Sequence, residues 1–193
     1  MIKFESVEIP FTDYTKQEIV SEGKLNSNIF IQEKCATEQC IDTLKSFHEK
    51  KIEDYVSGDI AERKELIQNL HTSFCDTLGT NSKLKFEPMS LWDMGYHDPD
   101  TNVVAINDML LESEDPKELI MTDLHEIRHD FQDKAVRMPF SVDVDETLIN
   151  IWKENFENYI SPEFDFEAYS KQPVEVDANN FAALVYNNAI KSA

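Results

Sequence analysis

This sequence has no long hydrophobic run and few basic residues for its number of acids. No stretch approaches the about 20 apolar residues that a membrane-spanning helix needs. The first residues do not begin a signal peptide, because Glu5 interrupts them early. Lys and Arg total 18 against 38 Asp and Glu, which gives a formal net charge of −20. This balance argues against nucleic-acid binding, which needs basic residues to neutralise phosphates, and against an anionic membrane surface.

Cysteine is sparse as well. Cys35, Cys40 and Cys75 form an odd set that lacks the paired spacing of a zinc ribbon. We expect them to be buried apolar residues in a reduced, cytoplasmic compartment. The chain also lacks internal repeats and low-complexity linkers. Its 193 residues and 41% hydrophobic content predict a single domain over residues 1–193 with a real core.

The most informative stretch that is present is His125-Glu126-Ile127-Arg128-His129. On a helix, residues four apart share a face and lie roughly 6 Å apart along the axis, so the two imidazoles could bind one tetrahedral Zn²⁺. Glu126 lies next to the first of them and could act on a water molecule at the open position of the metal. The pattern fixes only three residues, and an amphipathic helix with two histidines would also produce it. The flanking sequence therefore has to decide.

The flanking sequence predicts one uninterrupted helix around the motif. Asp115 can cap it, Pro116 suits its first position, and Glu118 would complete a capping box. No Gly or Pro intervenes before Pro139, so both histidines should lie well inside the helix. The apolar residues that recur at helical spacing are Leu119, Ile120, Leu124, Ile127 and Phe131.

A third ligand is expected downstream, because catalytic zinc sites usually have three protein ligands. Pro173 fits the first turn of a second helix, and Glu175 would stand one turn inside it. Taken alone, Glu175 and Asp177 would be solvated acids that suit a helix N-terminus. Taken with the upstream motif, Glu175 is interpreted as the third ligand. Residues that would form the buried side of this helix or allow its close approach are Ala178, Phe181, Ala182, Ala183, Leu184 and Val185.

A helix with H-E-x-x-H followed by a helix that supplies Glu resembles the gluzincin metallopeptidases. The E-V-D-A-N-N-F-A-A-L sequence of residues 175–184 is similar to the last helix of compact zinc peptidases of mobile elements that cleave phage-type repressors. The H-E-I-R-H-D-F-Q sequence of residues 125–132 resembles the H-E-x-R-H-x-x-Q form of small bacterial and phage zincins. The repressor-cleaving group usually has Gly where this chain has Arg128.

The resemblance covers roughly residues 92 to 190 and leaves the preceding part unmatched. It implies a zincin-like α+β fold with a small mixed or antiparallel sheet, an active-site helix and a helix that carries the glutamate. It also implies that His125, His129 and Glu175 bind one Zn²⁺ and that Glu126 is the general base.

The segment before the motif predicts a β-hairpin over residues 94–107, with turn formers followed by Val103, Val104 and Ile106. Its edge strand could line a cleft and pair with an extended substrate, although an ordinary hairpin that closes a core is an equal alternative. We expect residues 91–193 to form the catalytic part and residues 1–90 a mostly helical part.

Two helices are predicted in the N-terminal half. Residues 33–57 and 59–78 carry apolar side chains at helical spacing, and Gly58 and Gly79 end the two segments. Residues 2–11 alternate loosely and could form a strand. The histidines on the two helices, His48 and His71, are interpreted as structural rather than metal-binding.

Residues 140–172 connect the motif helix to the helix of Glu175. An amphipathic helix is expected first, and Ser161-Pro162 ends it. Phe164, Phe166 and Tyr169 follow in an aromatic-rich loop. These rings could form one wall of a substrate cleft, but we favour ordinary core packing for them.

Together these features predict a zinc-dependent peptidase that acts on a narrow range of peptide or protein substrates. Tyr169 or His97 would stabilise the oxyanion, and Asp177 or Asn179 would orient a ligand histidine. Arg128, which turns away from the face of the two histidines, would pair with an acid such as Asp177.

Two other functions remain open. The first is a non-catalytic, metal-binding regulatory protein on the same fold, which the acidic surface and the unmatched N-terminal half permit. The second is a zinc hydrolase of a non-peptide amide, such as a deformylase. That class takes a cysteine ligand upstream of the motif, and no cysteine lies near the motif here.

Overall fold

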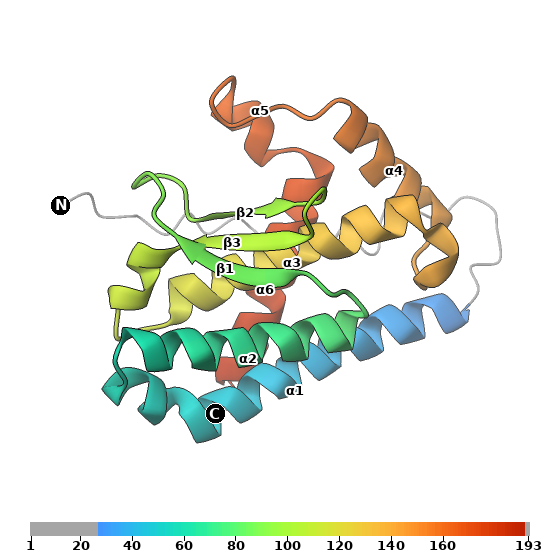
Figure 1. The fold of residues 1–193 in the computed structure, drawn as a ribbon. Coiled ribbons are helices and arrows are strands. Elements are labelled where there is room, and N and C mark those ends of the chain that lie inside the picture. The colour runs from blue at the N-terminus through green and yellow to red at the C-terminus, as the bar shows by residue number, and fades with distance from the viewer. Residues whose placement is uncertain (1–26, 192–193) are drawn as a thin grey trace.

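The computed structural model describes residues 27–191 and, of these, the side chains of residues 36–191. This part of the chain is α+β, with long helices packed around a small sheet (Figure 1). The strand predicted over residues 2–11 lies outside it. The helices are α1 (Ser27–Ser57), α2 (Ile60–Leu78), α3 (Lys117–Arg137), α4 (Glu146–Glu157), α5 (Phe166–Ser170) and α6 (Pro173–Lys191), and the strands are β1 (Lys83–Glu87), β2 (Gly95–Asp98) and β3 (Val103–Asn107).

The sheet is mixed and has the strand order β1-β3-β2. β2 and β3 form the antiparallel hairpin that the sequence predicts, with Tyr96 opposite Ala105. β1 pairs in parallel with β3, with Leu84 opposite Val104. β1 belongs to the part that was expected to be mostly helical, with no strand at this position, so the predicted boundary near residue 90 cuts through the sheet.

Helix α3 carries the H-E-x-x-H motif and packs against α6, α4, α2 and the strands β2 and β3. The apolar residues predicted for its inner face are all buried. The helix begins at Lys117, one residue later than expected, and Asp115 accepts the Lys117 amide N–H at 3.0 Å. The capping box with Glu118 does not form, because the Asp115 amide donates to Ser113 Oγ instead.

Helix α6 lies against α3 and presents Glu175 in its first turn. Phe181 and Val185 are buried as predicted, whereas Leu184 is 39% exposed and does not belong to the buried side. Asn155 of α4 holds the start of α6, because its Oδ1 accepts the Val174 amide N–H at 3.0 Å. The position of Glu175 is therefore fixed by two neighbouring helices.

A buried ion pair joins the N-terminal helices to α3. His71 of α2 donates from Nδ1 to Asp123 Oδ1 at 2.7 Å, and its Nε2 lies 3.1 Å from Ser82 O. Burial lowers the pKa of His71, but the Asp123 carboxylate outweighs this effect and raises the pKa from 6.5 to about 11. His71 is therefore interpreted as a cation that joins α2 to α3, which agrees with the structural role predicted for it. Cys40 and Cys75 are free and buried nearby, also as predicted.

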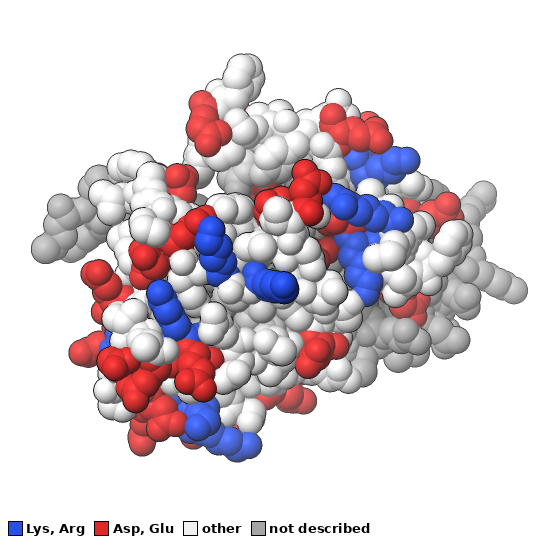
Figure 2. Space-filling view, in the orientation of Figure 1, with Lys and Arg blue, Asp and Glu red and all other residues white. Residues whose placement is uncertain are grey.

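Acidic side chains are spread over the visible face, with fewer basic ones between them (Figure 2). Among the described residues, no helix combines the length and apolar character needed to cross a membrane. The aromatic loop differs from the prediction. Phe164 and Phe166 are 87% and 70% exposed, so they do not pack in the core, while Tyr169 is half-buried.

Candidate metal centre

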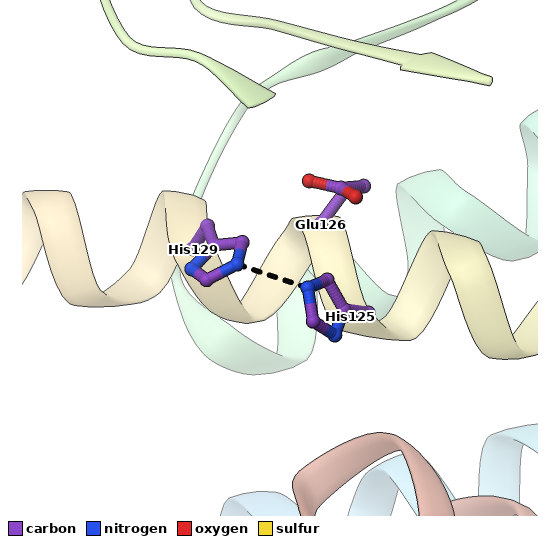
Figure 3. Close-up of side chains that lie close together, drawn as sticks. All are labelled: His125, Glu126 and His129. Atoms are coloured by element: carbon purple, nitrogen blue, oxygen red, sulfur yellow. Dashed lines mark hydrogen bonds between the residues drawn. The ribbon is translucent and has the colours of Figure 1, made fainter. Parts of the chain in front are cut away.

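The two histidines of the motif face each other on α3. The distance between His125 Nε2 and His129 Nε2 is 3.0 Å, and the two rings meet edge-to-face at an interplanar angle of 83°. Figure 3 shows both rings turned toward one another on the same side of the helix. One helical turn separates them, so α3 alone sets this spacing.

Glu175 of α6 approaches the same point from the neighbouring helix. Its Oε2 lies 3.3 Å from His125 Nε2, and its Oε1 lies 3.5 Å from His129 Nε2. The side chain is only 1% exposed, and Oε2 accepts no hydrogen bond from any described residue. Burial raises the pKa of Glu175, but its contacts with the two imidazoles outweigh this effect and hold the pKa well below its usual range.

Glu126 completes the group without sharing the histidine face. It has a carboxylate oxygen within 4.8 Å of ligand atoms of both His125 and His129, and it is buried. In Figure 3 its carboxylate points from α3 toward the strands, away from the space between the two imidazoles. Burial is the largest influence on Glu126 and raises its pKa. Gly95 of β2 lies close to the Glu126 side chain, since a Cβ at Gly95 would come within 3.4 Å of Glu126 Cγ.

Gln132 determines which nitrogen of His129 carries the proton. Its amide nitrogen donates to Val174 O at 3.0 Å and to Asp177 Oδ2 at 2.7 Å, and both atoms can only accept. The amide oxygen of Gln132 must therefore be the atom that faces His129 Nδ1 at 2.8 Å, and Nδ1 must be the donor. Neutral His129 accordingly has its lone pair on Nε2, toward His125 and Glu175.

His125 is contacted from α6, where its Nδ1 lies 3.1 Å from Asn179 Oδ1 and would donate to it when Nδ1 carries the proton. In their neutral forms the two imidazoles would then direct two lone pairs at each other across 3.0 Å. A cation between the rings, either a proton or a metal ion, would relieve this repulsion. In the protein without metal, burial lowers the pKa of His129, but Glu175 and Glu126 raise it to about 9, so a proton takes this role.

Arg128 supports the same network from a position on α3 beside the two histidines, where it also meets α6. Its guanidinium forms two hydrogen bonds to Asp177, at 2.7 and 3.1 Å, as the sequence predicts. It is buried and lies over three aromatic rings, with 4.9 to 5.3 Å between its Cζ and the ring centroids. Asp177 is shared between Arg128 and Gln132, so it does not contact a ligand histidine directly. Asn179 does so instead.

Two further predictions concerned the oxyanion donor. Tyr169 lies close enough to interact with Glu175, and this contact, after burial, raises the pKa of its hydroxyl. His97 lies instead beside Asp130, with 3.9 Å between Nε2 and Oδ1. The sequence did not single out Tyr159, whose hydroxyl donates to Glu175 Oε1 at 2.7 Å. It also assigned no role to Gln132, although the i+3 spacing from His129 signals a shared helix face.

The donor atoms fit a single metal ion. A tetrahedral ion with ligand distances of about 2.0–2.1 Å places its ligands roughly 3.3 Å from one another. The three distances among His125 Nε2, His129 Nε2 and the Glu175 carboxylate are 3.0, 3.3 and 3.5 Å. Oε2 of Glu175 has no hydrogen-bond partner among the described residues, so it could bind such an ion together with the lone pairs on the histidine Nε2 atoms.

Comparisons of the chain with protein-family models, with curated proteins and with solved structures found no match. The zincin-like fold and the resemblance to gluzincins and to the peptidases of phage and mobile elements therefore stay predictions from the motif residues. The geometry of the site stands independently of them.

Proposed function

We propose that this chain is a zinc-dependent peptidase. The observation that carries the proposal is that two imidazole Nε2 atoms of one helix and a buried carboxylate of another meet at one point. The Nδ1 atom of each imidazole lies beside a side-chain amide oxygen. Two histidines and one glutamate are a donor set typical of catalytic zinc, where a fourth position stays open for water or substrate. His125, His129 and Glu175 would hold one Zn²⁺.

Zinc in such a set lowers the pKa of bound water and polarises a carbonyl group. The protein supplies the remaining chemistry. Glu126 lies beside the histidines, is not needed as a ligand, and would take a proton from the attacking water and pass it to the leaving amine. Tyr169, which lies close to Glu175, would donate a hydrogen bond to the reacting carbonyl, whereas the hydroxyl hydrogen of Tyr159 is already donated to Glu175 Oε1.

A peptide substrate is favoured by the position of β2. Among the described strands it pairs with β3 alone, so its outer edge leaves backbone groups available to an extended chain. The same strand contacts α3 at Glu126 through Gly95. A segment paired with this edge would run past the general base.

The test uses Glu126→Gln, with Glu118→Gln as its control, since Glu118 is an exposed acid at the start of the same helix. Both variants should carry about one Zn²⁺ per chain after purification without chelators. Glu126→Gln should lose about 10²- to 10⁴-fold in hydrolysis of a proteome-derived peptide mixture followed by mass spectrometry, because an amide cannot accept the proton of water. Glu118→Gln should cleave like the wild type.

Three outcomes contradict parts of the proposal. Elemental analysis that finds no metal in the purified protein would contradict the metal centre at His125 and His129. Equal cleavage by Glu126→Gln and the wild type would remove Glu126 as the general base. Glu126→Gln should also trap the natural partner, and a variant that matches the wild type in every cellular assay would favour the non-catalytic alternative.

A further inference from the structure

A row of aromatic side chains leads from the candidate metal centre to the surface. Tyr159 donates its hydroxyl hydrogen to Glu175 Oε1. The ring centroids of Tyr159 and Tyr169 are 6.1 Å apart, and Tyr169 and Phe166 are separated by the same distance. Phe164 precedes Phe166 in the turn before α5. We call Tyr159, Tyr169, Phe166 and Phe164 the aromatic wall.

The outer end of the aromatic wall lies in solvent. Tyr159 is 44% exposed and Tyr169 is half-buried, whereas Phe166 and Phe164 are strongly exposed, and α5 projects away from the helical body in Figure 1. Large exposed apolar patches on soluble proteins mark binding sites. This patch is continuous with a residue of the candidate centre, so its occupant would lie next to the reacting groups.

The aromatic wall is interleaved with acids. Glu163, Asp165 and Glu167 alternate with the two phenylalanines, and all three are exposed. Asp165 accepts the Ala168 amide N–H as the cap of α5, and Glu167 pairs with Lys171. Glu163, and Glu157 at the end of α4 two residues before Tyr159, are exposed and carry further negative charge. Figure 2 shows acidic side chains on the projecting part of the molecule that carries α5.

We propose that the aromatic wall binds the segment of the peptide substrate in which a large apolar residue is flanked by Lys or Arg. The apolar residue would stack on Phe166 and Tyr169, and the cations would pair with Glu163 and Glu157 or lie over the ring faces. This inference rests on the proposed peptidase function and specifies its substrate class.

Charge complementarity separates this occupant from two others. A second copy of the chain would place acids against acids, because a two-fold interface repeats the same patch on both sides. A membrane rich in anionic lipid would meet the same repulsion. A basic, apolar peptide satisfies both the rings and the carboxylates.

The test measures binding by fluorescence anisotropy at low ionic strength, with Glu126→Gln protein so that the probe is not cleaved. The probe is a short fluorescein-labelled peptide in which Phe alternates with Lys. Two matched probes carry Glu in place of every Lys, or Ser in place of every Phe. The Phe/Lys probe should bind at least about tenfold more tightly than either matched probe, and higher salt should weaken its binding.

The double substitution Phe164→Ser and Phe166→Ser, made in the same Glu126→Gln protein, should weaken binding of the Phe/Lys probe at least about tenfold. The control is Phe140→Ser, because Phe140 is even more exposed than Phe164 and Phe166 but lies beyond the end of α3. Equal affinity of the double variant and its parent, equal weakening by Phe140→Ser, or no preference for Lys over Glu would overturn the inference. So would sedimentation that shows a dimer dissociated by the double substitution.

These outcomes are distinct from a failure of the proposed function. Zinc content and cleavage are measured on the wild type in separate experiments. A chain that binds the Phe/Lys probe through the aromatic wall but carries no zinc keeps the binding surface and loses the peptidase assignment. A chain that carries zinc and cleaves peptides without this preference loses only the aromatic wall.

Discussion

At the scale of single residues, the candidate centre depends on the side chains that hold its ligands as much as on the ligands. The two histidines could be found from their spacing alone. The orientation of the Gln132 amide toward His129 could not, because it depends on Val174 and Asp177 of another helix. A sequence shows which residues share a helix face, but the partner across the interface is set only when the helices pack.

The assignment of the third ligand can be tested at Glu175. Glu175→Ala removes the only carboxylate that contacts both imidazoles among the described residues, and it should lower zinc affinity by at least about a hundredfold. Loss of an outer partner alone typically costs about 10–100-fold. Competition with a chromophoric chelator measures the affinity. Glu167→Ala removes an exposed acid of α5 and should leave the affinity unchanged, while unchanged affinity in Glu175→Ala would move the ligand to another acid.

The positioning role of Gln132 makes a second prediction. Gln132→Met keeps a side chain of similar length but cannot accept from His129 Nδ1, so zinc affinity should fall by about 10–100-fold. Gln68→Met is the matched change at an exposed site of α2. An effect on thermal stability without an effect on zinc affinity would assign Gln132 a structural role only.

At the scale of elements, the helices were the most predictable part, because apolar spacing and the stops at Gly58 and Gly79 are local signals. Gly79 ends α2 with φ of 67°, a conformation that favours glycine. β1 was missed because a five-residue strand is defined by its pairing with β3, which lies well beyond it along the chain. The exposure of Phe164 and Phe166 was missed for a related reason, since residue type alone does not determine burial.

The contact between β2 and α3 predicts the effect of Gly95→Ala. The new Cβ would lie 2.8 Å from Ala105 O and 2.8 Å from Thr122 Cγ2 and would push β2 away from Glu126. Hydrolysis should fall while zinc content stays unchanged, and overpacking should cost about 1–3 kcal/mol in the free energy of unfolding. Adding Thr122→Ser removes Cγ2 and should restore part of the activity. Full activity in Gly95→Ala would show that the distance between β2 and Glu126 does not matter.

At the scale of the whole molecule, the N-terminal helices and the segment that carries the motif are joined through buried groups. Arg63 of α2 donates to Leu111 O at 2.9 Å, and the His71–Asp123 pair links α2 to α3 two residues before the first candidate ligand. β1 adds a third connection through the sheet. The half that the motif resemblance leaves unmatched therefore supports the helix that carries the motif.

This connection predicts a pH dependence of stability. The pKa of His71 is about 11 in the folded protein and 6.5 as its ordinary value, so the folded state holds the proton more tightly. The stabilising contribution should be complete below pH 6.5 and should decline steadily as pH rises from 6.5 toward 11. His71→Gln removes the titrating group. Chemical denaturation of both proteins across this pH range measures the free energy of unfolding. The stability advantage of wild type over variant should shrink as pH rises; a constant difference would show that Asp123 does not hold His71 as a cation.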